Sequence, residues 1–311
     1  MPVTLTVAAI RDVTERVREF LLEPAGEAPA RHAAGAHLDF DLPVGRRSYS
    51  LIDWPDDAPG TLRIAVQRED EGAGGSRAMH ALTPGARLSA EGPRNDFPLR
   101  DHDGPALLLA GGIGITPIIS HATALAAADR PFALHYAVRS RTAAAYADRL
   151  AEQFGERLHL WPDDETPIDL PALMAAQGRG THLYVCGPKG LIEAARAAFT
   201  AAGHDDGAVH FELFASEAAQ AGDQPFEVEI ASTGQVFTIP PGRTIIEVLE
   251  EAGIDLVYDC QRGDCGICQT GVIAGTPDHR DVVLSESERA GGKVMQICVS
   301  RAKTPRLVLD L

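Results

Sequence analysis

The sequence has 311 residues, of which 45% are hydrophobic and 23% charged, so its length and composition suit a globular protein of two or three domains. The formal net charge of −16 is spread along the whole chain and argues against binding to nucleic acid or to an anionic membrane. Five cysteines, no secretory leader pattern and no apolar run of bilayer length predict a cytoplasmic protein with reduced thiols and no membrane partner.

Residues 1–103 contain short segments of strand-like alternation, separated by turns rich in Pro, Gly and Asp. This pattern predicts an antiparallel β-barrel. Arg47 and Tyr49 are two positions apart and therefore share one face of a strand, while Ser50 offers backbone and hydroxyl groups. Such a set suits a flat ring with polar edges and a phosphate tail, although Arg-x-Tyr-Ser also occurs by chance in many strands.

A glycine-rich turn that ends in Gly75 and Ser76 leads directly into a predicted helix. The backbone N–H groups at such a helix start can bind an anion, for example a phosphate. The alternative is a turn without a ligand, which describes most Gly-Gly-Ser segments.

Residues 104–215 alternate apolar strands with helices, which predicts an α/β domain whose ligand binds at the carboxyl ends of the strands. The first strand ends in a glycine turn that contains Gly112 and Thr116, an arrangement typical of a pyrophosphate site. The spacing is not Gly-x-Gly-x-x-Gly, so a plain tight turn is the alternative. Cys186 ends a later strand, and on its own it is best interpreted as a small buried hydrophobe.

Arg139 and Arg141 follow the second strand of this segment, where the adenosine ribose of a dinucleotide is expected. An arginine there can accept a 2′-phosphate, whereas an acidic residue favours the free 2′-hydroxyl. A solvated basic turn is the alternative interpretation.

The small, polar and aperiodic stretch 216–224 predicts a linker. In residues 225–311, a hairpin, a crossing helix and further strands follow, and this order fits a β-grasp ferredoxin.

Four cysteines in this last segment carry the most specific signal of the sequence. They form a Cys-x4-Cys-x2-Cys run with a distant fourth member, which is the plant-type spacing for a [2Fe–2S] cluster: Cys260, Cys265, Cys268 and Cys298. Gly263 and Gly266 allow the loop to fold back around the cluster. A zinc site is the alternative, but zinc ligands are usually arranged as two close pairs.

The order of these motifs resembles that of the phthalate dioxygenase reductase family, including the reductases of vanillate-type O-demethylases. The resemblance covers essentially the whole chain: Arg-x-Tyr-Ser, Gly-Gly-Ser, Gly-Gly-Ile-Gly-Ile-Thr-Pro, Cys-Gly-Pro and the ferredoxin spacing. It implies an FMN-binding barrel, an NAD(P)-binding α/β domain and a [2Fe–2S] ferredoxin domain. FMN is favoured over FAD because no loop for an adenine is evident.

The resemblance also implies roles for single residues in the flavin site. It assigns the isoalloxazine ring to Arg47, Tyr49 and Ser50, and the FMN phosphate to Gly75 and Ser76. Relatives often carry Arg where this chain has Ala73, so one phosphate contact is either missing here or supplied by Arg77.

In the nucleotide site, the resemblance assigns Gly112 and Thr116 to the pyridine nucleotide and places Cys186 against the nicotinamide. Phe214 is expected at the flavin–nicotinamide face, with Glu212 nearby.

The implied function is that of an NAD(P)H-dependent oxidoreductase, with NADH favoured, which feeds electrons through FMN and the cluster to a Rieske-type aromatic oxygenase or O-demethylase. Because flavin exchanges electrons singly or in pairs, it connects hydride transfer to one-electron carriers. Two alternatives stay open from the sequence: a reductase for a cytochrome P450, and a non-catalytic zinc-bearing interaction module.

Overall fold

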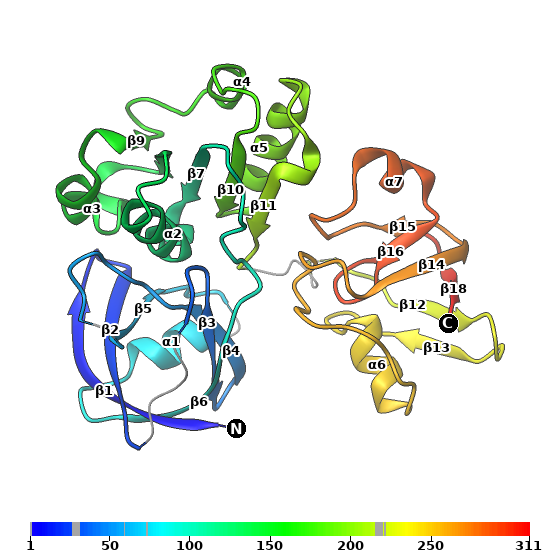
Figure 1. Cartoon of the computed structure of the whole chain (residues 1–311). Helices are drawn as coiled ribbons and strands as arrows, with labels where there is room; N and C mark the ends of the chain where they lie inside the picture. The colour runs from blue at the N-terminus through cyan, green and yellow to red at the C-terminus, as the bar shows by residue number, and fades with distance from the viewer. Residues whose placement is uncertain (1, 27–31, 59, 73, 215–219, 221) are drawn as a thin grey trace. The chain divides into compact units, whose positions relative to one another are not determined.

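The computed structural model describes residues 2–26, 32–58, 60–72, 74–214, 220 and 222–311. The chain divides into two compact units, Met1–Glu212 and Leu213–Leu311. The first unit, blue to green in Figure 1, contains two sheets, and the second, yellow to red, contains the remaining ones. Most of the predicted linker lies outside the described residues, and the domain boundaries stay predictions.

The first sheet of unit one is antiparallel throughout and confirms the predicted barrel architecture. Its strand order is β4-β3-β6-β1-β2-β5. Alternate residues such as Leu5, Val7 and Phe20 are fully buried, so one face of each strand forms the core. The strands are β1 (Val3–Asp12), β2 (Val17–Pro24), β3 (His37–Leu42), β4 (Gly45–Ser50), β5 (Leu62–Gln67) and β6 (Arg87–Arg94), and the short helix α1 spans Gly75–His80.

The second sheet of unit one is parallel, with the order β11-β10-β7-β8-β9. All six residues of its central strand are buried, which explains the unbroken apolar run in the sequence. The strands are β7 (Ala106–Gly111), β8 (Phe132–Val138), β9 (Leu158–Pro162), β10 (His182–Cys186) and β11 (Val209–Glu212). The helices are α2 (Ile115–Ala127), α3 (Ala147–Phe154), α4 (Leu170–Ala175) and α5 (Lys189–Ala201).

The barrel and the parallel sheet share one apolar core. Ile52, Trp54 and Phe97 from the barrel side pack in the same cluster as the buried residues of α2 and β7. A buried hydrogen bond of 2.9 Å from the Tyr146 hydroxyl to the Glu19 carboxylate reinforces this contact. Burial raises the pKa of Tyr146 well above its ordinary value, so the phenol keeps its proton and donates.

Unit two has the five-stranded order β13-β12-β18-β14-β16 expected of a β-grasp fold, with helix α6 starting at a Thr244–Glu247 capping box. Its elements are β12 (Phe226–Ile230), β13 (Val236–Ile239), α6 (Ile245–Glu251), β14 (Gln269–Ala274), β15 (Pro277–Asp278), α7 (Glu286–Gly291), β16 (Val294–Gln296), β17 (Arg301–Ala302) and β18 (Arg306–Asp310).

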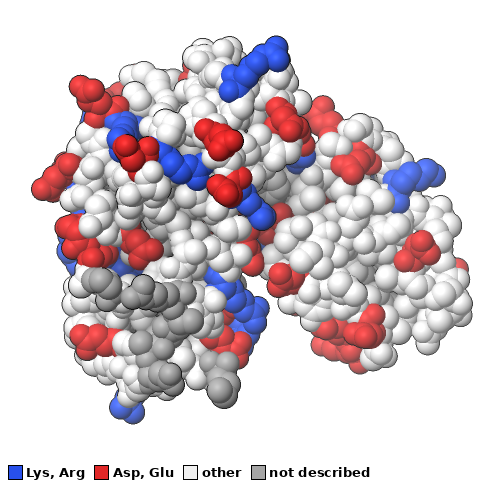
Figure 2. All heavy atoms as spheres, in the orientation of Figure 1, with Lys and Arg blue, Asp and Glu red and all other residues white. Residues whose placement is uncertain are grey.

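The surface carries mixed charge. Figure 2 shows acidic and basic side chains interspersed on one face, without a large basic patch there. Within the described residues, no helix is long and apolar enough to cross a membrane.

A buried ionic cluster fastens the chain just before β12 to the rest of unit two. Asp223 binds Arg280 at 2.6 Å and Arg301 at 3.5 Å, and the three side chains are only 7%, 6% and 4% exposed. Asp278 is a second partner of Arg280, at 2.8 Å. The hydrogen bonds from Arg280 lower the pKa of Asp223 to about 2.

Asp223→Ala is expected to lower the free energy of unfolding of unit two by about 3 kcal/mol. This is the lower end of the range for a broken buried ion pair, because Asp278 still pairs with Arg280. Since the folded pKa lies below the unfolded value of about 3.9, the stabilisation is complete above that value and is lost as the pH falls through about 2. Urea unfolding followed by circular dichroism at pH 7 and pH 3 measures both effects. The exposed control Asp255→Ala should change stability by less than about 0.5 kcal/mol at pH 7.

Candidate flavin, nucleotide and iron–sulfur sites

The predicted flavin residues lie on β4. Arg47 and Tyr49 are both half-buried, and β3 pairs them with Phe40 and Leu38 respectively, so they share a face of the strand. The Tyr49 ring packs on Phe40 with centroids 5.8 Å apart. Burial raises the pKa of Tyr49 to about 12, which keeps the phenol protonated at neutral pH. Ser50 ends the strand and is buried.

The glycine-rich turn before α1 meets β4 directly. A Cβ at Gly75 would lie 2.6 Å from Cγ of Arg47, so only glycine lets the arginine side chain cross the turn here. The Ser76 hydroxyl accepts a hydrogen bond of 2.9 Å from the backbone N–H of Glu69, which fixes the turn to the chain beyond β5. The structure therefore brings Arg47 and Gly75 together from positions 28 residues apart in the sequence.

Arg77 is the predicted substitute for the phosphate contact that relatives make at the position of Ala73. Ala73 lies outside the described residues. The Arg77 guanidinium donates to the backbone carbonyl of Asp70, so it is held on the same turn. Its role toward a phosphate stays a prediction.

The nucleotide turn after β7 packs against the end of β10. A Cβ at Gly114 would lie 2.2 Å from the carbonyl oxygen of Cys186, and this contact requires a glycine. Gly112 has φ +54 and faces open space. The Thr116 hydroxyl donates to the Ile113 carbonyl at 3.0 Å and so shapes the turn from within.

Cys186 and Glu212 are direct neighbours across the β10–β11 ladder. Cys186 is fully buried, and Glu212 is only 3% exposed. Both lie at the carboxyl edge of the parallel sheet, which is where proteins with this architecture bind their ligands. Phe214 follows two residues later in the second unit and is 38% exposed.

Arg141 has a partner that sequence reasoning missed. Its Nε donates to both carboxylate oxygens of Glu165 at 2.9 Å. Glu165 lies in the turn after β9, and β9 is the neighbour of β8 in the sheet, so the two turns meet at the carboxyl edge. Arg139 is exposed beside them. The acidic run at 163–165 is the signal in the sequence that could have indicated this pairing.

The four cysteines of the predicted cluster interact with one another through their sulfur atoms. Cys260 accepts hydrogen bonds from the thiols of Cys265 and Cys298, and these bonds lower its pKa far below the ordinary range. Cys268 interacts in turn with Cys298. One further hydrogen bond of 3.4 Å joins Cys268 to the Gln296 side chain. The protein thus gathers the four potential thiolate ligands in one place.

The loop that carries three of these cysteines depends on its glycines. Gly263 and Gly266 have φ values of +82 and +80, in the region that favours glycine. A Cβ at Gly263 would also lie 2.6 Å from the Val299 side chain. Between them, Asp264 accepts a hydrogen bond of 3.0 Å from the Leu213 backbone, and burial raises its pKa to about 7. Sequence reasoning missed this carboxylate.

The sulfur contacts of the four cysteines suit a binuclear cluster. They include the pair Cys260 and Cys265 and the pair Cys268 and Cys298, and Cys260 also contacts Cys298. Two pairs of thiolates are what the two iron atoms of a plant-type [2Fe–2S] cluster require.

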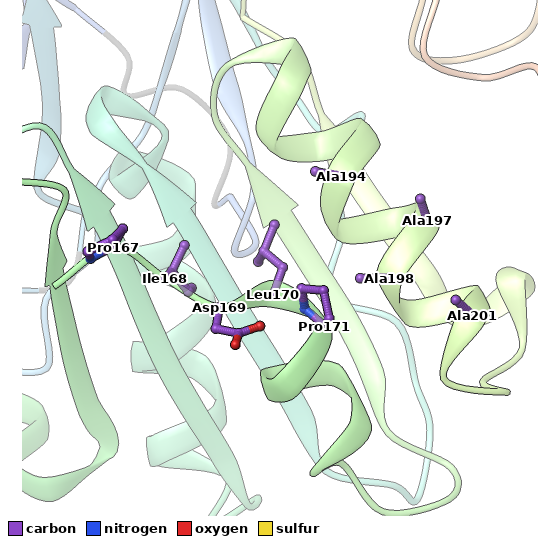
Figure 3. Close-up of a pocket in the computed structure, with 9 residues that line it drawn as sticks. All are labelled: Pro167, Ile168, Asp169, Leu170, Pro171, Ala194, Ala197, Ala198 and Ala201. Carbon is purple, nitrogen blue, oxygen red and sulfur yellow. The ribbon is translucent and has the colours of Figure 1, made fainter.

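A separate cavity of about 700 Å³ lies between the segment that enters α4 and the alanine-rich face of α5 (Figure 3). It contains none of the site residues predicted from the sequence. Its lining is apolar apart from one aspartate: Pro167, Ile168, Asp169, Leu170, Pro171, Ala194, Ala197, Ala198 and Ala201.

Two family descriptions match the chain. Residues 228–303 match the 2Fe-2S iron-sulfur cluster binding domain, and residues 93–209 match the N-terminal domain of dimethylamine monooxygenase subunit DmmA-like proteins. The chain is 44% identical to phenoxybenzoate dioxygenase subunit beta of Ectopseudomonas oleovorans, with 100% of this chain and 98% of that protein covered. It is 40% identical to vanillate O-demethylase oxidoreductase of Pseudomonas putida, with 98% of each covered.

Solved structures agree with these relatives. Phthalate dioxygenase reductase, whose structure is described as modular for electron transfer from pyridine nucleotides to [2Fe–2S], superposes with a TM-score of 0.75 at 34% identity over 99% of this chain and 97% of that one. An intact type IV self-sufficient cytochrome P450 monooxygenase gives a TM-score of 0.72 at 38% identity, and all of this chain matches 41% of that protein. The chain therefore belongs to the phthalate dioxygenase reductase family of NAD(P)H-dependent iron–sulfur flavoproteins.

Proposed function

We propose that the protein oxidises NADH and delivers the electrons one at a time to a Rieske-type aromatic oxygenase or O-demethylase. The observation that carries this proposal is the combination, in one chain, of a barrel, a parallel nucleotide-type sheet and a ferredoxin unit with four gathered cysteines. Bound FMN supplies the exchange between two-electron and one-electron transfer. None of the five cysteines, all of which lie in the described residues, forms a disulfide, and this supports a reducing, cytoplasmic location.

In this proposal the flavin ring lies against the face of β4 that carries Arg47 and Tyr49, next to Ser50. The protonated Tyr49 phenol is a hydrogen-bond donor to a polar ring edge. The crossing of Arg47 over Gly75 supports the assignment of the phosphate to this turn, because it places a guanidinium beside backbone N–H groups. Ser76 contributes by fixing the turn.

The pyridine nucleotide binds along the carboxyl edge of the parallel sheet. Gly112 provides the open approach for the pyrophosphate, and Thr116 maintains the shape of the turn. Cys186 and Glu212 lie side by side where the nicotinamide is expected. Hydride transfer needs no side chain as acid or base, so these residues serve to orient the ring.

The ferredoxin unit holds the cluster through Cys260, Cys265, Cys268 and Cys298. Thiolates are the form in which cysteine binds iron. The cluster is the one-electron outlet of the protein.

The names of the relatives support an oxygenase or demethylase as the acceptor, because one is a dioxygenase subunit and another a vanillate O-demethylase component. A cytochrome P450 is the second candidate. It is favoured by the match of the entire chain to part of a self-sufficient cytochrome P450 monooxygenase.

Mixing the reduced protein with a purified Rieske oxygenase and, separately, with a P450 tests the proposal. We expect NADH to bleach the flavin and cluster absorption, and the Rieske centre to be reduced faster than the haem. Faster reduction of the haem would select the P450 function, and a colourless protein after iron and flavin reconstitution would contradict both.

The Arg141–Glu165 ion pair predicts a preference for NADH. Glu165 is paired with the Arg141 guanidinium, which would otherwise bind a 2′-phosphate. The negative charge of Glu165 also repels a 2′-phosphate. Glu165→Gln should raise the ratio of kcat/KM for NADPH to that for NADH roughly threefold or more, the scale of one partly exposed ion pair. Arg141→Ala should not raise it. Steady-state kinetics with both nucleotides measure the ratios, beside the exposed control Glu156→Gln. An unchanged ratio in Glu165→Gln would remove Glu165 from nucleotide selection.

A further inference from the structure

Helix α2 is hydrogen-bonded to the chain segment that continues from β4. The Ser120 hydroxyl donates to the Leu51 carbonyl at 2.9 Å and accepts from the Asp53 backbone N–H, also at 2.9 Å. One turn of helix later, the Thr123 hydroxyl donates to the Asp53 carbonyl at 2.8 Å. Two side chains of one helix therefore bind three backbone groups of a neighbouring segment.

These bonds lie in the interior of the first unit. Ser120 is 2% exposed and Leu51 is 1% exposed, so water does not replace either partner. The adjacent His121 is fully buried and bonds through Nε2 to the Phe97 carbonyl at 2.9 Å. Burial lowers the pKa of His121 to about 4, so this ring is a neutral donor at physiological pH.

The two connected segments carry the two halves of the proposed redox site. Leu51 directly follows Ser50, at the end of the strand that also carries Tyr49. Thr116 lies at the end of the nucleotide turn, and Ser120 follows it by one turn of helix α2. The buried Ser120 hydroxyl thus connects the flavin strand directly to the nucleotide helix. Only a few residues separate this hydrogen bond from each half of the proposed site.

We infer that Ser120 is a positioning residue for hydride transfer. Its two hydrogen bonds fix the separation and the angle between the nucleotide helix and the flavin strand. This inference rests on the proposed oxidation of NADH by the bound flavin. Hydride transfer requires the reacting atoms to be aligned about 3–3.5 Å apart, and an error of about 1 Å costs on the order of a hundredfold in rate. Loss of the hydroxyl removes the polar bonds that set this distance and leaves the ligand contacts themselves untouched.

Ser120→Ala tests the inference in the full-length holoprotein. We expect it to bind FMN and NADH as the wild type does, while the stopped-flow rate of flavin reduction falls about tenfold or more. The long-wavelength charge-transfer band of the flavin–nicotinamide complex should weaken. The isotope effect on the rate of flavin reduction by 4-deuterated NADH should increase. A purely structural role would change neither the long-wavelength absorption nor the isotope effect.

Thr181→Val is the matched control. Thr181 is also 2% exposed and donates to the Gly178 carbonyl at 2.9 Å, but it precedes β10 at the edge opposite Cys186. It should therefore lose stability without losing the rate of flavin reduction.

Thr123→Val provides a second variant in case Ser120→Ala does not fold, and its reduction rate should fall in the same direction. If both α2 variants fold and reduce their flavin at the wild-type rate, the inference is overturned. If only Thr123→Val folds, a wild-type rate in that variant overturns it. If NADH does not reduce the flavin of the wild-type protein, the proposed function is overturned instead.

Discussion

Replacing Cys265 by serine is expected to abolish electron transfer to cytochrome c and to an oxygenase, while NADH still reduces the flavin. Serine is a poor iron ligand, and the four cysteines act as one set, so the loss of one thiolate removes the cluster. The predicted flavin and nucleotide residues other than Phe214 belong to the other compact unit and retain their packing. Visible absorption at the iron–sulfur bands, cytochrome c reduction and ferricyanide reduction with NADH measure the three effects.

Ser232→Ala is a suitable control because its hydroxyl binds the Leu311 carbonyl in the hairpin turn of the same unit and contacts no cysteine. This variant should keep both the cluster and cytochrome c activity. If Cys265→Ser folds but its flavin is no longer reduced by NADH, the proposed order of carriers is wrong.

The second large effect is expected for Gly114→Ala. The added Cβ would lie 2.2 Å from the Cys186 carbonyl oxygen and 2.8 Å from the Gly187 nitrogen, so the backbone of one strand end must move. We expect a loss of about 1–3 kcal/mol in the free energy of unfolding. Flavin reduction by NADH should fall on the order of a hundredfold, because the nucleotide turn is displaced.

Stopped-flow reduction by NADH, compared with chemical reduction by dithionite, separates nucleotide positioning from flavin loss in Gly114→Ala. The matched control is Gly190→Ala, since a Cβ at this helical glycine meets nothing within 4 Å. That change should be neutral or slightly stabilising. A Gly114→Ala protein with wild-type kinetics would show that the contact between the two turns relaxes without consequence.

Local patterns in the sequence predicted much of this architecture, because they record local constraints. The apolar run at 106–110 predicted a buried parallel strand, and the two-residue spacing of Arg47 and Tyr49 placed them on one face. The cysteine spacing predicted a cluster because three ligands lie in one loop, whose shape depends on nearby glycines.

Contacts between distant segments could not be predicted in this way. The segment of Arg141 left open a 2′-phosphate contact or a solvated basic turn, and neither interpretation included Glu165, which reaches Arg141 from the turn after the next strand of the sheet. Ser120 is an ordinary helical serine in the sequence, and its role depends on packing against Leu51. Such pairings require the sheet order and the helix placement, which a single sequence does not encode locally.

The parallel pairing of β12 with β18 has a practical consequence for electrochemistry. Glu227 pairs with Arg306 at one end of this ladder and Ile230 with Leu309 at the other, so the first and last strands of the unit run in the same direction. The chain enters the unit at one end of the sheet, and Leu311 reaches the opposite end, beside Ser232. A thiol or histidine tag fused after Leu311 would therefore emerge away from the entry point. Immobilisation of the protein on an electrode through this tag should leave the entering chain unstrained and permit voltammetry of the intact protein.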